Sequence, residues 1–148
     1  MMSLLKYSKS GFLFILILLS GGFVVAQNHS LTVQISNIKE KKGNIVISIF
    51  NNVKSFLKEG EELFKKTIPV KDRNMTITFV DLPSGYYAVA LYHDENGDHA
   101  CNKNILGIPK EWFGFSKNFS PLLRAPRFDE IKILLQKNDT IPIKMIRL

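Results

Sequence analysis

The sequence contains a single cysteine, Cys101. One cysteine cannot form an internal disulfide, so the disulfide-rich scaffolds of small secreted proteins are excluded. The sequence also lacks a cluster of basic residues, because its lysines alternate with acids in segments such as 39–42 and 58–66. Nucleic-acid-binding domains concentrate positive charge on one surface and interleave it with aromatic residues. We therefore expect a mildly basic, solvated surface and no nucleic-acid partner.

The beginning of the sequence has the pattern of an export signal. Two lysines precede an uninterrupted apolar run over 12–19, and small residues ending at Ala26 favour cleavage there. The apolar segment is shorter than the roughly 20 residues that span a membrane. We predict a signal peptide over 1–26, a single domain over 27–148 and an exported protein, periplasmic or extracellular, with no stable membrane span after cleavage. Removing the two lysines lowers the formal charge from +7 to +5.

Short strands dominate the remainder of the sequence. Apolar and polar residues alternate with a period of two, as expected for strands with one buried face. The predicted strands are 31–36, 45–50, 67–70, 75–80, 86–94, 130–136 and 141–148. We expect the first two to form a hairpin. In the fifth, the side chains that share the inward face are Tyr87, Val89, Leu91 and His93.

Two segments depart from the strand pattern. Residues 53–64 have apolar residues at helical spacing but are divided by Gly60, which favours one or two short turns of helix over a sheet edge. Residues 95–127 lack alternation, and so long a connection in a small domain is usually functional or packed on itself. The sequence therefore predicts an all-β fold, an antiparallel β-sandwich of about seven strands. We expect the segment 93–119 to form one long ordered loop across an end of it.

The segments LPSGYYAVALYHDENGD (82–98) and NILGIPKEWFGFS (104–116) resemble the uncharacterised bacterial domain-of-unknown-function family 2141. That family typically shows a G-x-Y-A strand, then H-D-x-N-x-N-G-x-x-D, G-I-P-x-E and G-F-S. Here His99 stands where the family usually has glycine, and Asn102 where it usually has aspartate. The resemblance implies an exported domain of immunoglobulin-like or transthyretin-like sandwich type, and no established enzymatic activity.

The acidic turn after the fifth predicted strand is a candidate calcium loop. Carboxylate and amide oxygens are the ligands that Ca²⁺ prefers, and four such residues follow the spacing of positions 1, 3, 5 and 9 of an EF-hand loop. These residues are Asp94, Asn96, Asp98 and Asn102, and the Ala100 carbonyl would occupy position 7. The alternative is an Asx-rich turn whose side chains bond to their own backbone amides.

Two positions weaken the calcium interpretation. Ile105 stands at position 12, where an EF-hand needs a bidentate acid, and His99 stands at position 6, where glycine makes the turn. A distant acid, Glu111 or Asp129, would have to complete the ligand set. We therefore favour the Asx-rich turn without a cofactor and keep Ca²⁺ as the alternative.

Two histidines and the cysteine lie around the same turn. The spacing of His93, His99 and Cys101 matches no zinc ribbon, and strand alternation directs His93 into the core. Cys101 could act as a nucleophile beside a histidine, but no third group that would orient such a pair is evident. We interpret it as a small buried residue and assign no catalytic residue.

The aromatic residues that follow the turn are a candidate ligand-binding surface. Trp112, Phe113 and Phe115, with Glu111 beside them, could present a stacking surface to a sugar or an apolar peptide group. The alternative is that these rings and Phe119 fold back and seal one end of the sandwich. We favour sealing, with Trp112 the residue most expected to remain partly exposed.

The function predicted from these observations is a non-catalytic binding or accessory module of the bacterial cell envelope that uses the 93–119 loop. Its partner would be an envelope protein or a carbohydrate. One alternative is a metal-assisted hydrolase built on Asp94, Asp98, His93 and His99. The other is a purely structural module of an envelope assembly.

Overall fold

Eight strands, one 3₁₀ turn and one short helix form the regular structure of residues 27–148, the part of the chain that the computed structural model describes. The predicted signal peptide at 1–26 lies outside the described residues. The elements are β1 (Asn28–Ser36), β2 (Asn44–Phe50), β3 (Phe64–Pro69), β4 (Met75–Pro83), β5 (Gly85–Asp94), β6 (Phe113–Phe115), η1 (Ser116–Asn118), α1 (Phe128–Ile131), β7 (Ile133–Leu135) and β8 (Asp139–Lys144).

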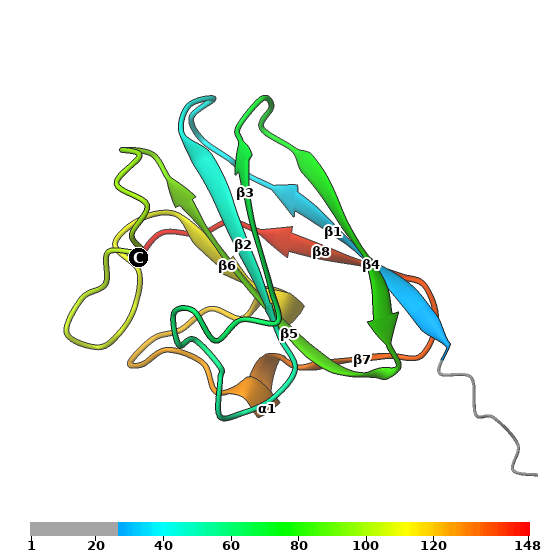
Figure 1. The fold of residues 1–148 in the computed structure, drawn as a ribbon. Helices are drawn as coiled ribbons and strands as arrows, with labels where there is room; N and C mark the ends of the chain where they lie inside the picture. Colours follow the sequence, from blue (N-terminus) through cyan, green and yellow to red (C-terminus); the bar gives the residue numbers. More distant parts are fainter. Residues whose placement is uncertain (1–26) are drawn as a thin grey trace, which may run out of the picture.

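The strands form two sheets that pack face to face (Figure 1). The smaller sheet has the order β4-β1-β8, and β1 pairs antiparallel with β4 and parallel with β8. The larger sheet has the order β3-β2-β5, and the free edge of β5 pairs with β7 near its beginning and with β6 near its end. The predicted all-β sandwich is confirmed, although one pair is parallel.

Alternating apolar residues from both sheets fill the space between them. The inward face of β5 is as predicted, because Tyr87, Val89, Leu91 and His93 are all buried. Tyr87, Val89 and Leu91 pack in one core cluster with residues of β1, β2, β4 and β8, including Leu31, Val33, Ile35, Ile45, Ile47, Ile49, Ile77, Phe79 and Ile143. Burial of this apolar surface is the main stabilising contribution to the fold.

A second apolar cluster covers part of the outer face of the larger sheet. Its members come from β2, β5, β6, α1 and the long loop: Phe50, Ala88, Ile108, Phe113, Phe115, Phe128 and Ile131. Phe56 packs edge to face against Phe50 and Phe128. The sheet is therefore buried on both faces along much of β5, which explains why both sides of this strand carry apolar residues.

Three local predictions were wrong. β1 and β2 do not form a hairpin, because they belong to different sheets and the segment between them crosses from one sheet to the other. Residues 53–64 form turns without a regular helix, although Phe56 and Leu57 pack against the second cluster. The strand predicted to begin at 130 begins as the helix α1. Within the described residues, the helices are too short and too polar to cross a membrane.

Candidate functional site

The base of the long loop is held by Asp94, the final residue of β5. Its side chain is fully buried and accepts hydrogen bonds from the Gly97 amide (2.7 Å) and the His99 amide (3.2 Å). Gly97 and His99 both adopt positive φ, 74° and 60°. A glycine at the position of His99 would adopt this backbone conformation without strain.

Asp98 forms the second half of the turn and remains solvent-exposed. Its carboxylate accepts the Ala100 amide (2.9 Å) and the side-chain amino groups of Asn102 (2.8 Å) and Asn96 (2.9 Å). The Ala100 hydrogen bond, followed by those from the two asparagines, lowers the pKa of Asp98. Asn96 and Asn102 therefore face Asp98 with nitrogen atoms, and the turn has the self-bonded geometry of an Asx-rich turn.

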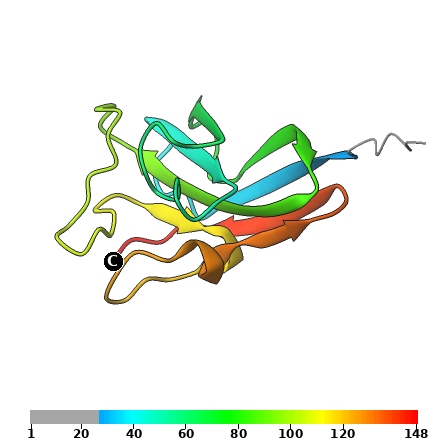
Figure 2. The same ribbon diagram turned by 60° about the horizontal axis from the view of Figure 1, so that its bottom comes forward.

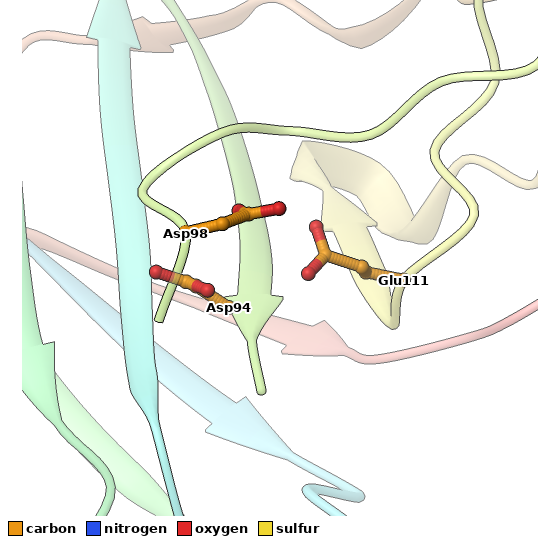
Figure 3. Close-up of side chains that lie close together, drawn as sticks. All are labelled: Asp94, Asp98 and Glu111. Carbon is orange, nitrogen blue, oxygen red and sulfur yellow. The ribbon is translucent and has the colours of Figure 1, made fainter. Parts of the chain in front are cut away.

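Glu111, which stands 13 residues beyond Asp98, completes a cluster of three acids. Each of the three side chains, Asp94, Asp98 and Glu111, contributes one carboxylate oxygen, and these three oxygens lie within 4.8 Å of one another (Figure 3). The other acid considered as a completing ligand, Asp129 on α1, instead pairs with Lys132, at 2.6 Å. The loop thus folds back so that its far end meets its own beginning.

Glu111 is the unusual member of this acidic cluster. Its Oε2 atom is buried and has no hydrogen-bond partner among residues 27–148. Burial, reinforced by repulsion from Asp98 and Asp94, raises the pKa of Glu111 to about 7. Three converging carboxylates can hold a shared proton or a hard cation such as Ca²⁺, because either relieves the repulsion between their charges.

The histidines and the cysteine do not converge on these acids as zinc ligands. His93 is fully buried and donates from Nε2 to the Lys42 carbonyl, at 2.7 Å. His99 is exposed, and its Nδ1 lies 3.7 Å from Asp94. Burial raises the pKa of the Cys101 thiol to about 11, so the thiol is protonated and weakly nucleophilic at neutral pH.

The aromatic residues are mostly packed against the domain, but Phe113 and Phe115 pack within strand β6, which pairs with β5, and not as a seal across one end of the sandwich. Phe113 and Phe115 are buried in the outer cluster, because Gly114 between them faces inward against Ile143. A Cβ at Gly114 would lie 2.5 Å from the Ile143 side chain. Trp112 is half-buried against the inner core with Lys39 5.5 Å from its ring centroid, and Phe119 is half-buried as well. Trp112 keeps part of its ring exposed, as predicted.

A pocket of about 170 Å³ lies on the outer face of the larger sheet, beside the outer cluster. The turn segment 57–65 forms one wall and residues 100–109 of the long loop form the other. The lining residues are Ser48, Phe50, Leu57, Lys58, Glu59, Glu62, Lys65, Ala90, Leu91, Tyr92, Ala100, Cys101, Lys103, Gly107, Pro109 and Phe115.

The sequence contains a signal for this pocket that our strand analysis did not use. Ser48 and Ala90 are adjacent in the β2–β5 register, and both are small residues on outward-facing strand positions. They are flanked by the aromatic residues Phe50 and Tyr92 on the same face. Small residues between large ones on adjacent strands create a hollow when another segment covers the sheet. Predicting it requires the pairing of β2 with β5.

The family assignment rests on a sequence profile described as "Uncharacterized protein conserved in bacteria (DUF2141)", which matches residues 33–142. The chain belongs to this family. The matched region of this DUF2141 member begins within β1 and ends within β8, so it includes the acidic cluster and all of the pocket. No curated protein and no solved structure matches the chain.

Proposed function

We propose that this DUF2141 protein is a non-catalytic binding module of the bacterial cell envelope, and that the long loop forms one wall of its binding site. The observation that carries the proposal is the pocket between residues 57–65 and 100–109. Its volume is similar to that of an apolar cavity of roughly 150 Å³ that admits benzene. The export signal predicted at 1–26 supports an envelope location.

The lining favours a ligand with an apolar body and an anionic group. Phe50, Leu57 and Phe115 provide apolar contact area, and Ser48 and Ala90 leave space at the floor. Lys58 and Lys65 are engaged by nearby glutamates. Lys103 makes no salt bridge to any residue in 27–148, so its ammonium group is available to an anion at the pocket edge. An envelope carbohydrate or a partner's side chain could supply such a group.

The pocket can be tested with 8-anilinonaphthalene-1-sulfonate, which combines aromatic rings with a sulfonate. A protein of residues 27–148 should enhance the fluorescence of this probe at a saturable site. Ser48→Leu should weaken binding about tenfold, because the leucine fills the floor. Lys103→Ser should weaken it severalfold through loss of the charge pair.

Thr78→Leu is the matched control, because Thr78 is an exposed residue on the outer face of the other sheet. It adds a leucine of the same size far from the pocket and should leave binding unchanged. Equal binding by the Ser48→Leu and Thr78→Leu proteins, or no saturable binding by the parent, would refute the proposal.

A second candidate function is divalent cation binding at Asp94, Asp98 and Glu111. The observation that favours it is the buried Glu111 Oε2, which lacks a partner in the described structure and lies beside two further acids. Ca²⁺ suits a set of carboxylate oxygens, and such a cation would fix the two ends of the loop to each other. The Asn96 and Asn102 amides would have to turn over to offer their oxygens as ligands.

Thermal unfolding in EDTA and then in millimolar Ca²⁺ tests the cation proposal, since a ligand that binds only the folded state raises the unfolding midpoint. We expect a rise in midpoint that Glu111→Gln abolishes. Asp129→Asn is the control, because Asp129 is an acid of the same domain outside the cluster. Absence of a shift, or an equal shift in both variants, would exclude this site.

A further inference from the structure

Residues 102–110 form a small hairpin within the long loop. Lys103 pairs with Pro109, the Lys110 amide donates to the Asn102 carbonyl (2.7 Å) and the Asn104 amide donates to the Ile108 carbonyl (2.9 Å). The turn at its tip closes with the Gly107 amide donating to the Asn104 carbonyl, at 2.9 Å. The hairpin therefore has a defined hydrogen-bonded turn at its tip.

The two central residues of this turn are apolar. Ile105 is fully exposed and Leu106 is 47% exposed. The Asn104 side chain accepts the amides of Leu106 (2.9 Å) and Ile108 (3.0 Å), so polar contacts hold the turn while its two apolar side chains point into solvent. Turn positions of this kind usually carry glycine, proline, asparagine or aspartate, so an Ile-Leu pair at the tip requires an explanation.

A second loop presents a matching pair beside the first. Leu122 and Leu123 are 82% and 80% exposed. The two loops are neighbours, since a Cβ built on Gly107 would lie 3.9 Å from the Ala125 Cβ. Both loops extend from the same end of the molecule in the two views (Figure 1, Figure 2). Four large apolar side chains are thus exposed at the tips of adjacent loops.

The segment of sequence that carries both tips has more basic residues than acids. Residues 100–127 contain five basic residues and a single acid, Glu111. Of these basic residues, Arg124 is neutralised by Glu130. Lys103 and Lys110 flank the Ile-Leu tip, one on each strand of the hairpin. Apolar tips with lysines set behind them match the depth profile of an anionic bilayer, in which acyl chains lie beneath negatively charged headgroups.

We propose that these two loop tips dock the domain on an anionic phospholipid surface. Ile105, Leu106, Leu122 and Leu123 insert among the acyl chains, and Lys103 and Lys110 contact the phosphate groups. The lysine side chains are long enough to keep their ammonium groups at the headgroup level while the loop tips insert among the acyl chains. The four apolar tip residues do not line the pocket, but Lys103 lies at the edge of the pocket as well as beside the hairpin tip, so the four apolar residues are the part of this contact that distinguishes it from the pocket.

Vesicle sedimentation tests the proposal with a protein of residues 27–148, which contains every strand and both apolar clusters described above. Vesicles of phosphatidylcholine with phosphatidylglycerol should bind the protein, and vesicles of phosphatidylcholine alone should bind it far less. Replacing Lys103 and Lys110 with serine should weaken binding about fivefold per lysine, and salt should weaken binding by the parent protein.

The decisive variant replaces Ile105, Leu106, Leu122 and Leu123 with serine. It should lose binding to anionic vesicles by more than tenfold while its thermal unfolding midpoint stays unchanged, because the four side chains are exposed. The control replaces Val53 and Val80, exposed residues outside both loops, and should bind like the parent.

Three results would overturn the proposal. The first is no binding of the parent protein to anionic vesicles. The second is salt-sensitive binding that the four serine substitutions leave intact, since electrostatic attraction alone would then explain it. The third is self-association of the parent that the same substitutions abolish, because a second copy of the chain would then be the partner of the tips.

Discussion

The outer face of the larger sheet is covered in two different ways along the same pair of strands. Toward the end of β2, Phe50 packs with Phe56 and Phe128 in a closed aromatic cluster. A few residues away on the same face, Ser48 and Ala90 form the floor of an open pocket. Two small side chains are thus the difference between a packed aromatic cluster and a pocket on the same face of the sheet. A candidate binding site can therefore depend on very few residues.

The largest loss in the free energy of unfolding should come from removing a ring from the closed aromatic cluster. Phe128→Ala would remove a ring that is 5% exposed and lies 5.9 Å from Phe56, centroid to centroid. We expect a loss of about 3–5 kcal/mol in the free energy of unfolding, because the cavity left behind cannot collapse fully. Urea denaturation measures it. In the pocket half, Ser48→Leu should change the same quantity by less than about 1 kcal/mol, and comparable losses in both variants would erase the contrast.

A smaller loss in the free energy of unfolding should follow from removing the hydrogen bonds that connect the aromatic cluster to the strands beneath it. Ser116 is fully buried, and its hydroxyl donates to the Ile131 carbonyl (2.7 Å) and accepts the Val89 amide (3.1 Å). Ser116→Ala would leave both backbone groups unsatisfied, at a cost of about 1–3 kcal/mol. Equilibrium unfolding gives the value. A loss near zero would mean that water or a backbone shift restores these contacts.

The smallest effect on the free energy of unfolding concerns the acidic cluster of Asp94, Asp98 and Glu111. The pKa of Glu111 is raised to about 7 in the folded chain from an ordinary value of 4.5. The folded state therefore binds more protons than the unfolded state between pH 4.5 and 7, so this residue lowers stability progressively as pH rises through that window. Glu111→Gln should be more stable at pH 8 by about 1 kcal/mol, a value reduced for solvent screening.

Denaturation of the parent and the Glu111→Gln protein at pH 5 and pH 8 measures this difference. At pH 5 the two proteins should be nearly equal in stability, since Glu111 is then protonated in the folded state. A difference that is the same at both pH values would show that the carboxyl charge is not responsible.

Much of the fold could be predicted because alternation is a local property. The inward face of β5 and the alternating residues of β4 follow directly from their sequence. The choice of strand partners is not local, and the predicted hairpin failed for that reason. Asn37 adopts positive φ and bonds to the Met145 carbonyl, a residue 108 positions away, as the chain leaves β1 for the other sheet.

The candidate site was predictable only in part. The residue types of the acidic turn predicted that its side chains would bond to their own amides, as Asp94 does with Gly97 and His99. The position of Glu111 beside Asp94 and Asp98 depends on how the whole loop folds back. Sequence spacing could therefore identify it only as one of two acids able to complete the ligand set. The pocket depends on two segments far apart in sequence meeting over β2 and β5, which no short-range pattern encodes.

The parallel pairing of β1 with β8 has a consequence for the order in which the protein can be built. β1 is the middle strand of its sheet, yet one of its two neighbours is synthesised more than a hundred residues later. During translation that edge of β1 has no strand to pair with until β8 is made. Contacts between residues this distant in sequence slow folding. A nascent chain with this topology cannot complete the smaller sheet until β8 has been synthesised, so the two-layered core closes only when almost the whole domain is available.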